Sequence, residues 1–224
     1  PNRDGSKGVG GCTYCNNNSF KPSYCNLDTN VKEQIQKGIN FFEKKYHSMR
    51  FLAYFQAYTN TYAPLKDLIR IYEEALNHPK IVGLVISTRP DSINDELLDY
   101  LTCLQQKVYV MIEFGIESHL ERTLMTINRC HTFNDSVNAL IRTNLRGINN
   151  CAHLILGLPG ESRQDWLEQA KIISKLPVKN LKLHQLQIQK GTVMAKQYSQ
   201  NPEQFHIFTA NEYIDLIVDY LELL

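Results

Sequence analysis

The chain has 224 residues, 43% of them hydrophobic and 21% charged, with a formal net charge of +1. This composition is typical of a folded domain with a substantial core rather than of a disordered or fibrous chain. A near-zero net charge provides no general attraction to nucleic acid, so a nucleic-acid partner is possible but is not indicated by the charge. No apolar run approaches the ~18 residues of a membrane-spanning helix, so no membrane partner is expected.

Helical and strand patterns alternate along the first part of the chain. Apolar residues recur at helical spacing over 31–46, and Asn30 with Glu33 is placed as a cap pair for that helix. The aromatic segment 50–58 is β-prone and predicts a strand, and the pattern over 64–76 predicts the next helix.

The later elements continue this alternation. We expect strands at 81–87, 108–115, 151–156 and 181–188, and helices at 97–104, 120–127, 137–141, 166–170 and from about 209 onward. Ser118 with Glu121, and Ser162 with Asp165, form capping patterns before two of these helices. Regular alternation of strands and helices indicates βαβ units, so the fold class is α/β with a mainly parallel sheet.

Both ends of the sequence are expected to continue in a longer protein. The chain opens inside a polar loop that no strand precedes, and it stops inside the apolar helical pattern that begins near Tyr213. Five strands are predicted, and a sixth is expected before Pro1.

The cysteines favour a reducing compartment, and the cytoplasm is the expected location. A chain of this size and apolar content does not need disulfides to be stable. Single cysteines are most often buried small apolar residues, which is our interpretation of Cys25, Cys103 and Cys151. Cys12 and Cys15 differ because they form a C-x-x-C pair in a glycine-rich loop.

The C-x-x-C pair is an incomplete site by its spacing alone. A zinc ribbon needs a second C-x-x-C or a histidine pair, which does not follow. A thioredoxin-like pair normally begins a helix, with little glycine before it. An iron–sulfur cluster is the remaining option, although it needs further thiolates.

The loop resembles the cluster-binding loop of radical S-adenosylmethionine (radical SAM) enzymes. The string PNRDGSKGVGGCTYCNNNSF resembles a bacterial branch related to the oxygen-independent coproporphyrinogen oxidases and to the catalytic subunit of Elongator. In that branch a cysteine directly precedes PNRDG, giving C-x11-C-x2-C. Other segments resemble the family in the same order: YFQAYTNTY (54–62), STRPD (87–91), EFGIES (113–118), INRCH (127–131) and HLILGLPGE (153–161).

The resemblance implies a fold and an organisation into segments. It implies a partial (βα)6 TIM-like barrel whose first strand lies outside this chain. Residues 1–190 would form the N-terminally truncated core barrel, and 191–224 would form an incomplete C-terminal helical segment. Chemistry in parallel α/β barrels is located on the loops that follow the strands, where these segments lie.

The resemblance also implies two cofactors and a set of ligands. A [4Fe–4S] cluster would be held by Cys12, Cys15 and a third cysteine just before Pro1. S-adenosylmethionine would be held by Tyr14, Gln56, Thr59, Asn60, Thr61, Glu117, Arg129, His153 and Gly157. An arginine suits the cofactor carboxylate because it forms a paired, charge-assisted contact. Cys130 takes a position where relatives have glycine, which leaves the local turn geometry open.

The implied activity is reductive cleavage of S-adenosylmethionine to a 5′-deoxyadenosyl radical, which abstracts hydrogen from an unidentified substrate. A one-electron donor of the flavodoxin or ferredoxin type is the expected partner. The alternation of its strand faces His184 into the barrel, so a substrate-side role is a hypothesis for this residue. Two alternatives stay open: a coproporphyrinogen oxidase-like or tRNA-modifying member of the same superfamily, and a non-catalytic barrel that binds S-adenosylmethionine or a partner.

Overall fold

The computed structural model describes residues 1–25, 28–46 and 49–224. The strands are β1 (Phe51–Phe55), β2 (Ile81–Thr88), β3 (Tyr109–Glu117), β4 (Asn149–Leu156) and β5 (Asn180–Gln185). The helices are α1 (Val31–Glu43), α2 (Leu65–Leu76), α3 (Asp95–Leu104), α4 (Glu121–Thr126), α5 (Phe133–Leu145), α6 (Arg163–Ile173), α7 (Val193–Gln200) and α8 (Ala210–Leu221). Short 3₁₀ turns occur at Asn17–Phe20, Pro90–Ser92 and Pro202–Gln204.

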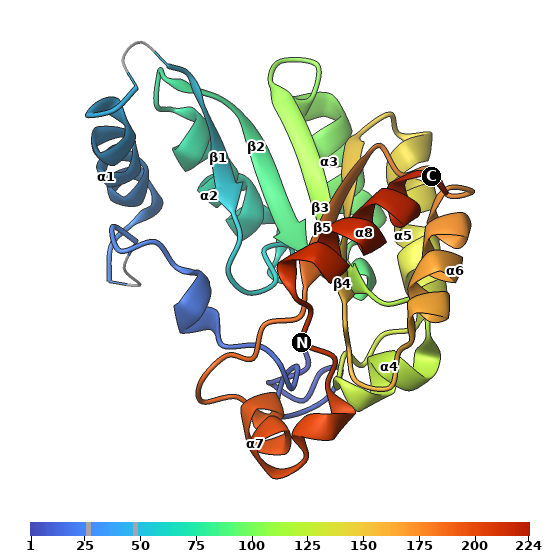
Figure 1. The fold of residues 1–224 in the computed structure, drawn as a ribbon. Coiled ribbons are helices and arrows are strands. Elements are labelled where there is room, and N and C mark those ends of the chain that lie inside the picture. The colour runs from blue at the N-terminus through green and yellow to red at the C-terminus, as the bar shows by residue number, and fades with distance from the viewer. Residues whose placement is uncertain (26–27, 47–48) are drawn as a thin grey trace.

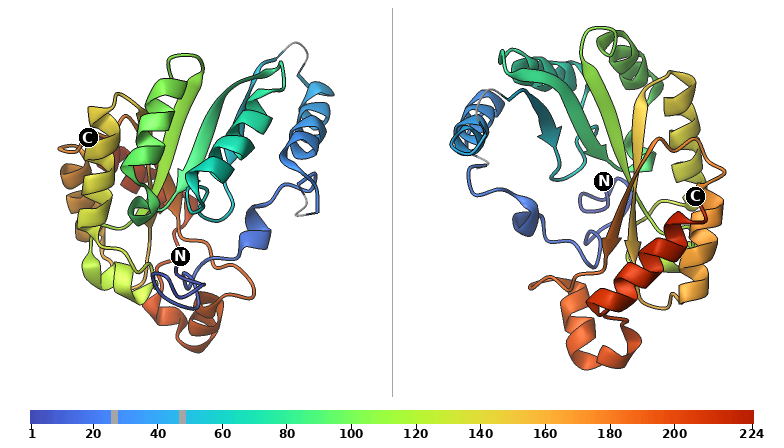
Figure 2. Two further views of the ribbon diagram at one scale, coloured as in Figure 1. Left: turned by 180° about the vertical axis from the view of Figure 1, so that it is seen from behind. Right: turned by 45° about the horizontal axis from the view of Figure 1, so that its top comes forward.

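The five strands form one parallel sheet in the order β1-β2-β3-β4-β5, curved into a half-barrel (Figure 1). Each crossover helix carries the chain back to the end of the sheet where the preceding strand began. Successive strands are therefore parallel, and each lies beside the strand before it in the sequence. The N-terminal segment, α4 and α7 lie together at the end toward which the strands point (Figure 1). Figure 2 shows the helices arranged around the outside of the curved sheet.

Two hydrophobic cores hold this arrangement. The larger core packs α2, α3, α5, α6 and α8 against the sheet, with fully buried residues such as Tyr72, Leu98 and Ile112. The smaller core lies at the carboxyl end of the strands and contains Leu124, Ile127, Leu158, Leu186 and Met194. Tyr14 packs against the smaller core, which ties the cysteine loop to the barrel.

The predicted α/β class and the five parallel strands are confirmed. The predicted strand at 50–58 ends earlier, at Phe55, and Tyr58 has a left-handed backbone (φ 67°) that strands do not adopt. The capping pattern at Ser162 is also confirmed, because its hydroxyl accepts from the Asp165 amide and the Asp165 carboxylate accepts from the Ser162 amide. Asn30 likewise caps α1.

Two expectations were wrong and one element was missed. Ser118 does not cap α4, because its hydroxyl instead hydrogen-bonds the Glu161 carboxylate, and the N-cap is Leu120 without a side-chain bond. Of the cysteines expected to be buried, only Cys151 is, whereas Cys103 is exposed on α3 and Cys25 is partly exposed. Helix α7 was not expected, since only Met194 of its eight residues is buried and its apolar pattern is weak.

Among the residues that the structure describes, no helix is long and apolar enough to cross a membrane.

Candidate functional site

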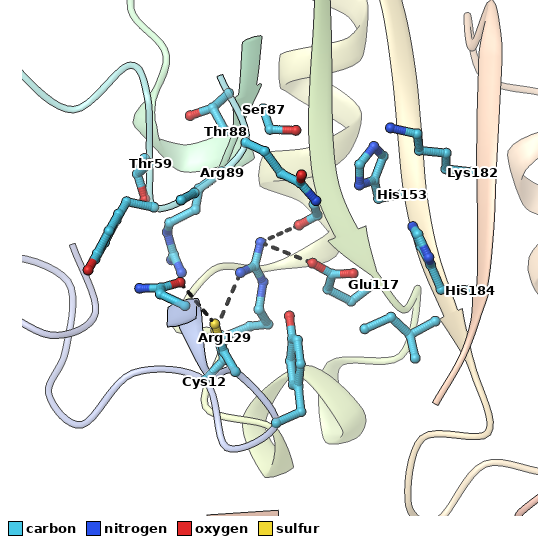
Figure 3. Close-up of a pocket in the computed structure, with 18 of the residues that line it drawn as sticks. Cys12, Thr59, Ser87, Thr88, Arg89, Glu117, Arg129, His153, Lys182 and His184 are labelled. Atoms are coloured by element: carbon cyan, nitrogen blue, oxygen red, sulfur yellow. Dashed lines mark hydrogen bonds and ion pairs between the residues drawn. The ribbon is translucent and has the colours of Figure 1, made fainter. Parts of the chain in front are cut away.

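A cavity of about 840 Å³ opens at the carboxyl ends of the strands (Figure 3). Its wall combines the cysteine loop, the loops after β1 and β2, and side chains of β3, β4 and β5. Nine of the residues that the sequence predicted as site residues line it: Cys12, Tyr14, Cys15, Gln56, Thr59, Glu117, Arg129, His153 and His184. Segments far apart in the sequence therefore meet around one space, as expected for a parallel barrel.

The two loop cysteines are in different electrostatic surroundings. Cys12 Sγ accepts hydrogen bonds from Asn2 Nδ2 at 3.3 Å and from Arg129 Nη1 at 3.4 Å. Burial by itself would raise the pKa of the Cys12 thiol, but the Arg129 charge and these two donors outweigh it and lower that pKa. Burial and the neighbouring Cys12 raise the pKa of Cys15.

The loop geometry fits an iron–sulfur cluster. The Cys15 amide donates to the Cys12 carbonyl at 3.1 Å in a main-chain turn, and both residues line the cavity. Donors directed at a cysteine sulfur favour the thiolate, which is the form that binds iron. Gly11 has φ 76°, a left-handed backbone conformation that favours glycine at this position of the loop.

Arg129 is fixed in a tight turn that contacts the cysteine loop. The residues on both sides of it, Asn128 (φ 55°) and Cys130 (φ 56°), have left-handed backbones. Asn128 Nδ2 donates to the carbonyls of Val9 and Gly11, each at 2.8 Å, and so joins the turn to the loop. Cys130 thus adopts a conformation that favours glycine, which answers the question left open by the sequence.

The Arg129 guanidinium is buried, with 7% of the residue exposed. Its Nη2 donates to the Gly115 carbonyl and lies 3.6 Å from Glu117 Oε1. Glu117 itself has φ 70° and follows a register shift at the end of β3. This irregularity turns the Glu117 carboxylate toward Arg129 and the cavity, as Figure 3 shows.

A second polar cluster lies deeper on the inner face of the sheet. Glu113 on β3 is buried and its carboxylate accepts from Tyr54 Oη at 2.7 Å and Ser87 Oγ at 3.0 Å. Lys182 Nζ lies 2.9 and 3.0 Å from its two oxygens, and His153 Nε2 lies 2.9 Å from Oε2. Burial would raise the pKa of Glu113, but contacts with His153, Lys182 and Tyr54 lower it to about 2.

The cluster has the ligand types of a metal site but not its charge balance. Glu113, Cys151 and His153 each offer a ligand atom within 4.8 Å of the others. The Lys182 ammonium already contacts both oxygens of Glu113, and burial with the nearby Glu113 charge raises the pKa of Cys151 to about 11. A metal ion would have to displace the ammonium and deprotonate this thiol, so the cluster is better described as an internal salt bridge.

Three predicted cofactor residues take part in the loops around the cavity without lining it. Asn60 Nδ2 donates to the carbonyls of Phe55 and Ser87, both at 2.9 Å. Thr61 Oγ1 lies 2.5 Å from Thr88 Oγ1 and from the Ser92 carbonyl. Gly157 has φ 91° and is packed so that a Cβ would lie 2.8 Å from Phe208. Their assignment to the cofactor stays a prediction.

The sequence did not single out several residues that the cavity contains. Lys182, Ser87 and Arg89 line the wall, and Glu113 contacts both Lys182 and Ser87. The available signal was the alternation on β3 and β5, which places Glu113 and Lys182 on the inner face. Their pairing across the sheet required the strand order.

Comparisons with known proteins show the family of this chain. The model of the radical SAM superfamily matches residues 8–173, and that of the radical SAM C-terminal domain matches 178–224. The chain is 37% identical to the uncharacterized protein YtqA of Bacillus subtilis, over 100% of this chain and 69% of that protein.

Two solved structures share the fold. The archaeal Elp3 of Methanocaldococcus infernus has a TM-score of 0.74 at 19% identity, over 87% of this chain and 50% of that one. Coproporphyrinogen III oxidase (HemN) of Escherichia coli has a TM-score of 0.65 at 15% identity, over 95% of this chain and 49% of that one. The chain thus spans about half the length of each of these two structures. It belongs to the radical SAM superfamily, whose cofactors are a [4Fe–4S] cluster and S-adenosylmethionine.

Proposed function

We propose that this chain is the core of an enzyme that cleaves S-adenosylmethionine reductively and uses the resulting 5′-deoxyadenosyl radical to abstract hydrogen from a substrate. The observation that carries the proposal is the contact between Cys12 and Arg129 at the carboxyl end of the sheet. It brings an iron-binding sulfur within hydrogen-bond reach of a guanidinium suited to a carboxylate. One cavity wall therefore offers groups for both cofactors.

Cys12 and Cys15 would hold the cluster, together with a third cysteine immediately before Pro1. When bound, the two cofactors supply the electron transfer and the radical. Arg129 would bind the carboxylate of S-adenosylmethionine, and Glu117 would accept from its ammonium or ribose. The rest of S-adenosylmethionine would contact Tyr14, Gln56, Thr59 and His153. The shape of its binding pocket would depend on the loops that contain Asn60, Thr61 and Gly157.

The other parts of the proposal concern partners and location. His184 lines the cavity on β5 beside His153, with ring centroids 5.5 Å apart, which supports a substrate-side role. A flavodoxin- or ferredoxin-type protein would supply the electron, and the cytoplasm would be the compartment, since free thiols survive in reducing surroundings.

The test is formation of 5′-deoxyadenosine by the anaerobically reconstituted full-length protein with dithionite and S-adenosylmethionine. We expect wild type and Cys103→Ala to form it, because Cys103 is exposed on α3 and does not line the cavity. Cys12→Ala and Cys15→Ala are expected to form none. A wild type that binds S-adenosylmethionine without cleaving it would favour the non-catalytic barrel and contradict the proposal.

A further inference from the structure

Arg89 is a buried arginine at the carboxyl end of β2 with an unused donor. Its Nε and Nη2 each lie 3.0 Å from one oxygen of Asp91, so two of its three nitrogens form a paired contact. Its Nη1 is buried and has no acceptor among the residues that the structure describes. Only 4% of Arg89 is exposed, and the residue lines the cavity. A buried donor without an acceptor is costly, so such groups are often found where a ligand binds.

The turn that carries Arg89 is held in place from two sides. Thr61 contacts Thr88, which precedes the 3₁₀ turn Pro90–Ser92, and the carbonyl of Ser92 at the end of that turn. Asp91, which is also nearly buried, fixes the plane of the guanidinium. Arg89 therefore has little conformational freedom to lose when a ligand arrives.

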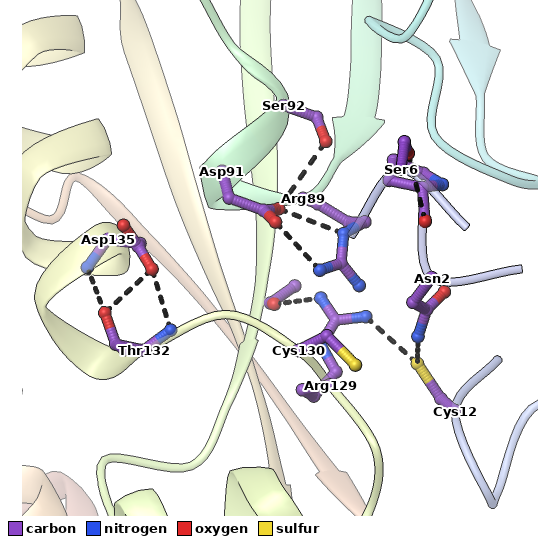
Figure 4. Close-up of polar contacts among 12 residues, drawn as sticks. Asn2, Ser6, Cys12, Arg89, Asp91, Ser92, Arg129, Cys130, Thr132 and Asp135 are labelled. Carbon is purple, nitrogen blue, oxygen red and sulfur yellow. Dashed lines mark hydrogen bonds and ion pairs between the residues drawn. The ribbon is translucent and has the colours of Figure 1, made fainter. Parts of the chain in front are cut away.

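Arg89 and Arg129 face each other near the cysteine loop. Figure 4 shows the two guanidiniums between Asp91 and Cys12. Both act on His131, whose pKa is lowered to about 2 by burial and by the charges of Arg129 and Arg89. Arg129 also has a buried Nε without an acceptor among the described residues. Two adjacent cations with unused donors favour an anion between them.

We propose that Arg89 is a second binding residue for the carboxylate of S-adenosylmethionine, with Asp91 as its positioning residue. This inference rests on the proposed function. The carboxylate is the only anionic group of S-adenosylmethionine, and its two oxygens can accept from two guanidiniums at once. Arg89 thereby contributes to recognition of the amino-acid end of the cofactor.

The test compares two ligands that differ only in this group. Equilibrium binding of S-adenosylmethionine and of decarboxylated S-adenosylmethionine is measured on the reconstituted full-length holoprotein without reductant, so that neither ligand is consumed. We expect Arg89→Gln to raise the dissociation constant of S-adenosylmethionine by about tenfold or more, and to change that of the decarboxylated ligand by less than about twofold. Arg122→Gln is the control, since Arg122 is an exposed arginine of α4 that pairs with Asp165.

A general effect on folding is distinguished from loss of this contact. Asp91→Asn keeps the Arg89 charge but removes its charged positioning partner. We expect it to weaken the binding of S-adenosylmethionine, by a smaller factor than Arg89→Gln does, and to leave the binding of the decarboxylated ligand unchanged. If Arg89→Gln does not fold, Asp91→Asn decides the question by the same comparison. If the binding of both ligands is weakened equally, or if the binding of S-adenosylmethionine is not weakened, the inference is overturned.

The two proposals fail separately. A wild type that forms 5′-deoxyadenosine, together with an Arg89→Gln variant that binds both ligands as wild type does, would leave the proposed function standing and sink this inference. A wild type that binds no S-adenosylmethionine would contradict both.

Discussion

Arg129 depends on a turn that few residue types adopt comfortably. Asn128 and Cys130 on either side of it have left-handed backbones, which cost ~1–2 kcal/mol for most non-glycine residues. Asn128 offsets part of this cost through its two bonds to the cysteine loop. Cys130 packs against Gly8 instead, since a Cβ on Gly8 would lie 2.6 Å from Cys130 Sγ.

We expect Gly8→Ala to destabilise the protein by about 1–3 kcal/mol, because the added methyl overlaps the Cys130 sulfur. In a Cys130→Gly background that sulfur is absent, and the same change is expected to cost less than about 1 kcal/mol. The free energy of unfolding in denaturant, measured for the four proteins of this cycle, checks the coupling. An equal loss in both backgrounds would show that the two residues do not contact each other.

Among the elements, the strands are joined by side-chain contacts on the inner face of the sheet as well as by their main-chain hydrogen bonds. Glu113 on β3 contacts Tyr54 of β1, Ser87 of β2 and Lys182 of β5. The ammonium of Lys182 also lies 4.8 Å from the centre of the Tyr54 ring, which adds a cation–π contact. These contacts link β1, β2, β3 and β5 across the inner face, so we expect the polar cluster to stabilise the sheet.

Stability should therefore depend on the ionised state of Glu113. Its pKa is about 2 in the fold against an ordinary 4.5, so its contribution is complete above about pH 4.5 and is lost as the pH falls toward 2. We expect Glu113→Gln to destabilise by about 1–3 kcal/mol at pH 7, since it removes a buried carboxylate that accepts hydrogen bonds from Tyr54 and Ser87, whereas the partly exposed Lys182 stays solvated. The difference from wild type should shrink between pH 4.5 and pH 2.

Denaturant unfolding at several pH values measures this difference. The matched control is Glu168→Gln, which removes a half-exposed carboxylate that pairs with Lys171 on the surface of α6. That change is expected to stay within about 1 kcal/mol at every pH. A Glu113→Gln protein as stable as wild type at pH 7 would rule out a stabilising role for the Glu113 carboxylate.

The same elements show what sequence could and could not predict. Continuous apolar runs such as residues 81–87 predicted strands, because parallel strands buried on both faces are apolar along most of their length. The cap at Ser118 failed because a tertiary contact with Glu161 takes its hydroxyl, which local spacing does not reveal. Resemblance located the Cys12 loop and Arg129, but the partners Glu113 and Lys182 are 69 positions apart and meet only through the strand order.

In the molecule as a whole, segments that are distant in the sequence meet at the cavity because all the strands end on the same side of the sheet. The cysteine loop closes the carboxyl end of the half-barrel, and the smaller core with Leu124 and Met194 fixes it there. The strands supply the polar wall, and the turns after β2 and α4 supply the two arginines. We propose that this end of the barrel holds an iron–sulfur cluster at Cys12 and Cys15.

The most direct test of that claim is the iron and sulfide content of the full-length protein purified and reconstituted without oxygen. Wild type and Cys103→Ala are each expected to hold about four irons and four sulfides per chain, as a [4Fe–4S] cluster requires. Cys12→Ala and Cys15→Ala should each lose most of both while remaining folded. Full iron and sulfide content in these two variants would contradict the account.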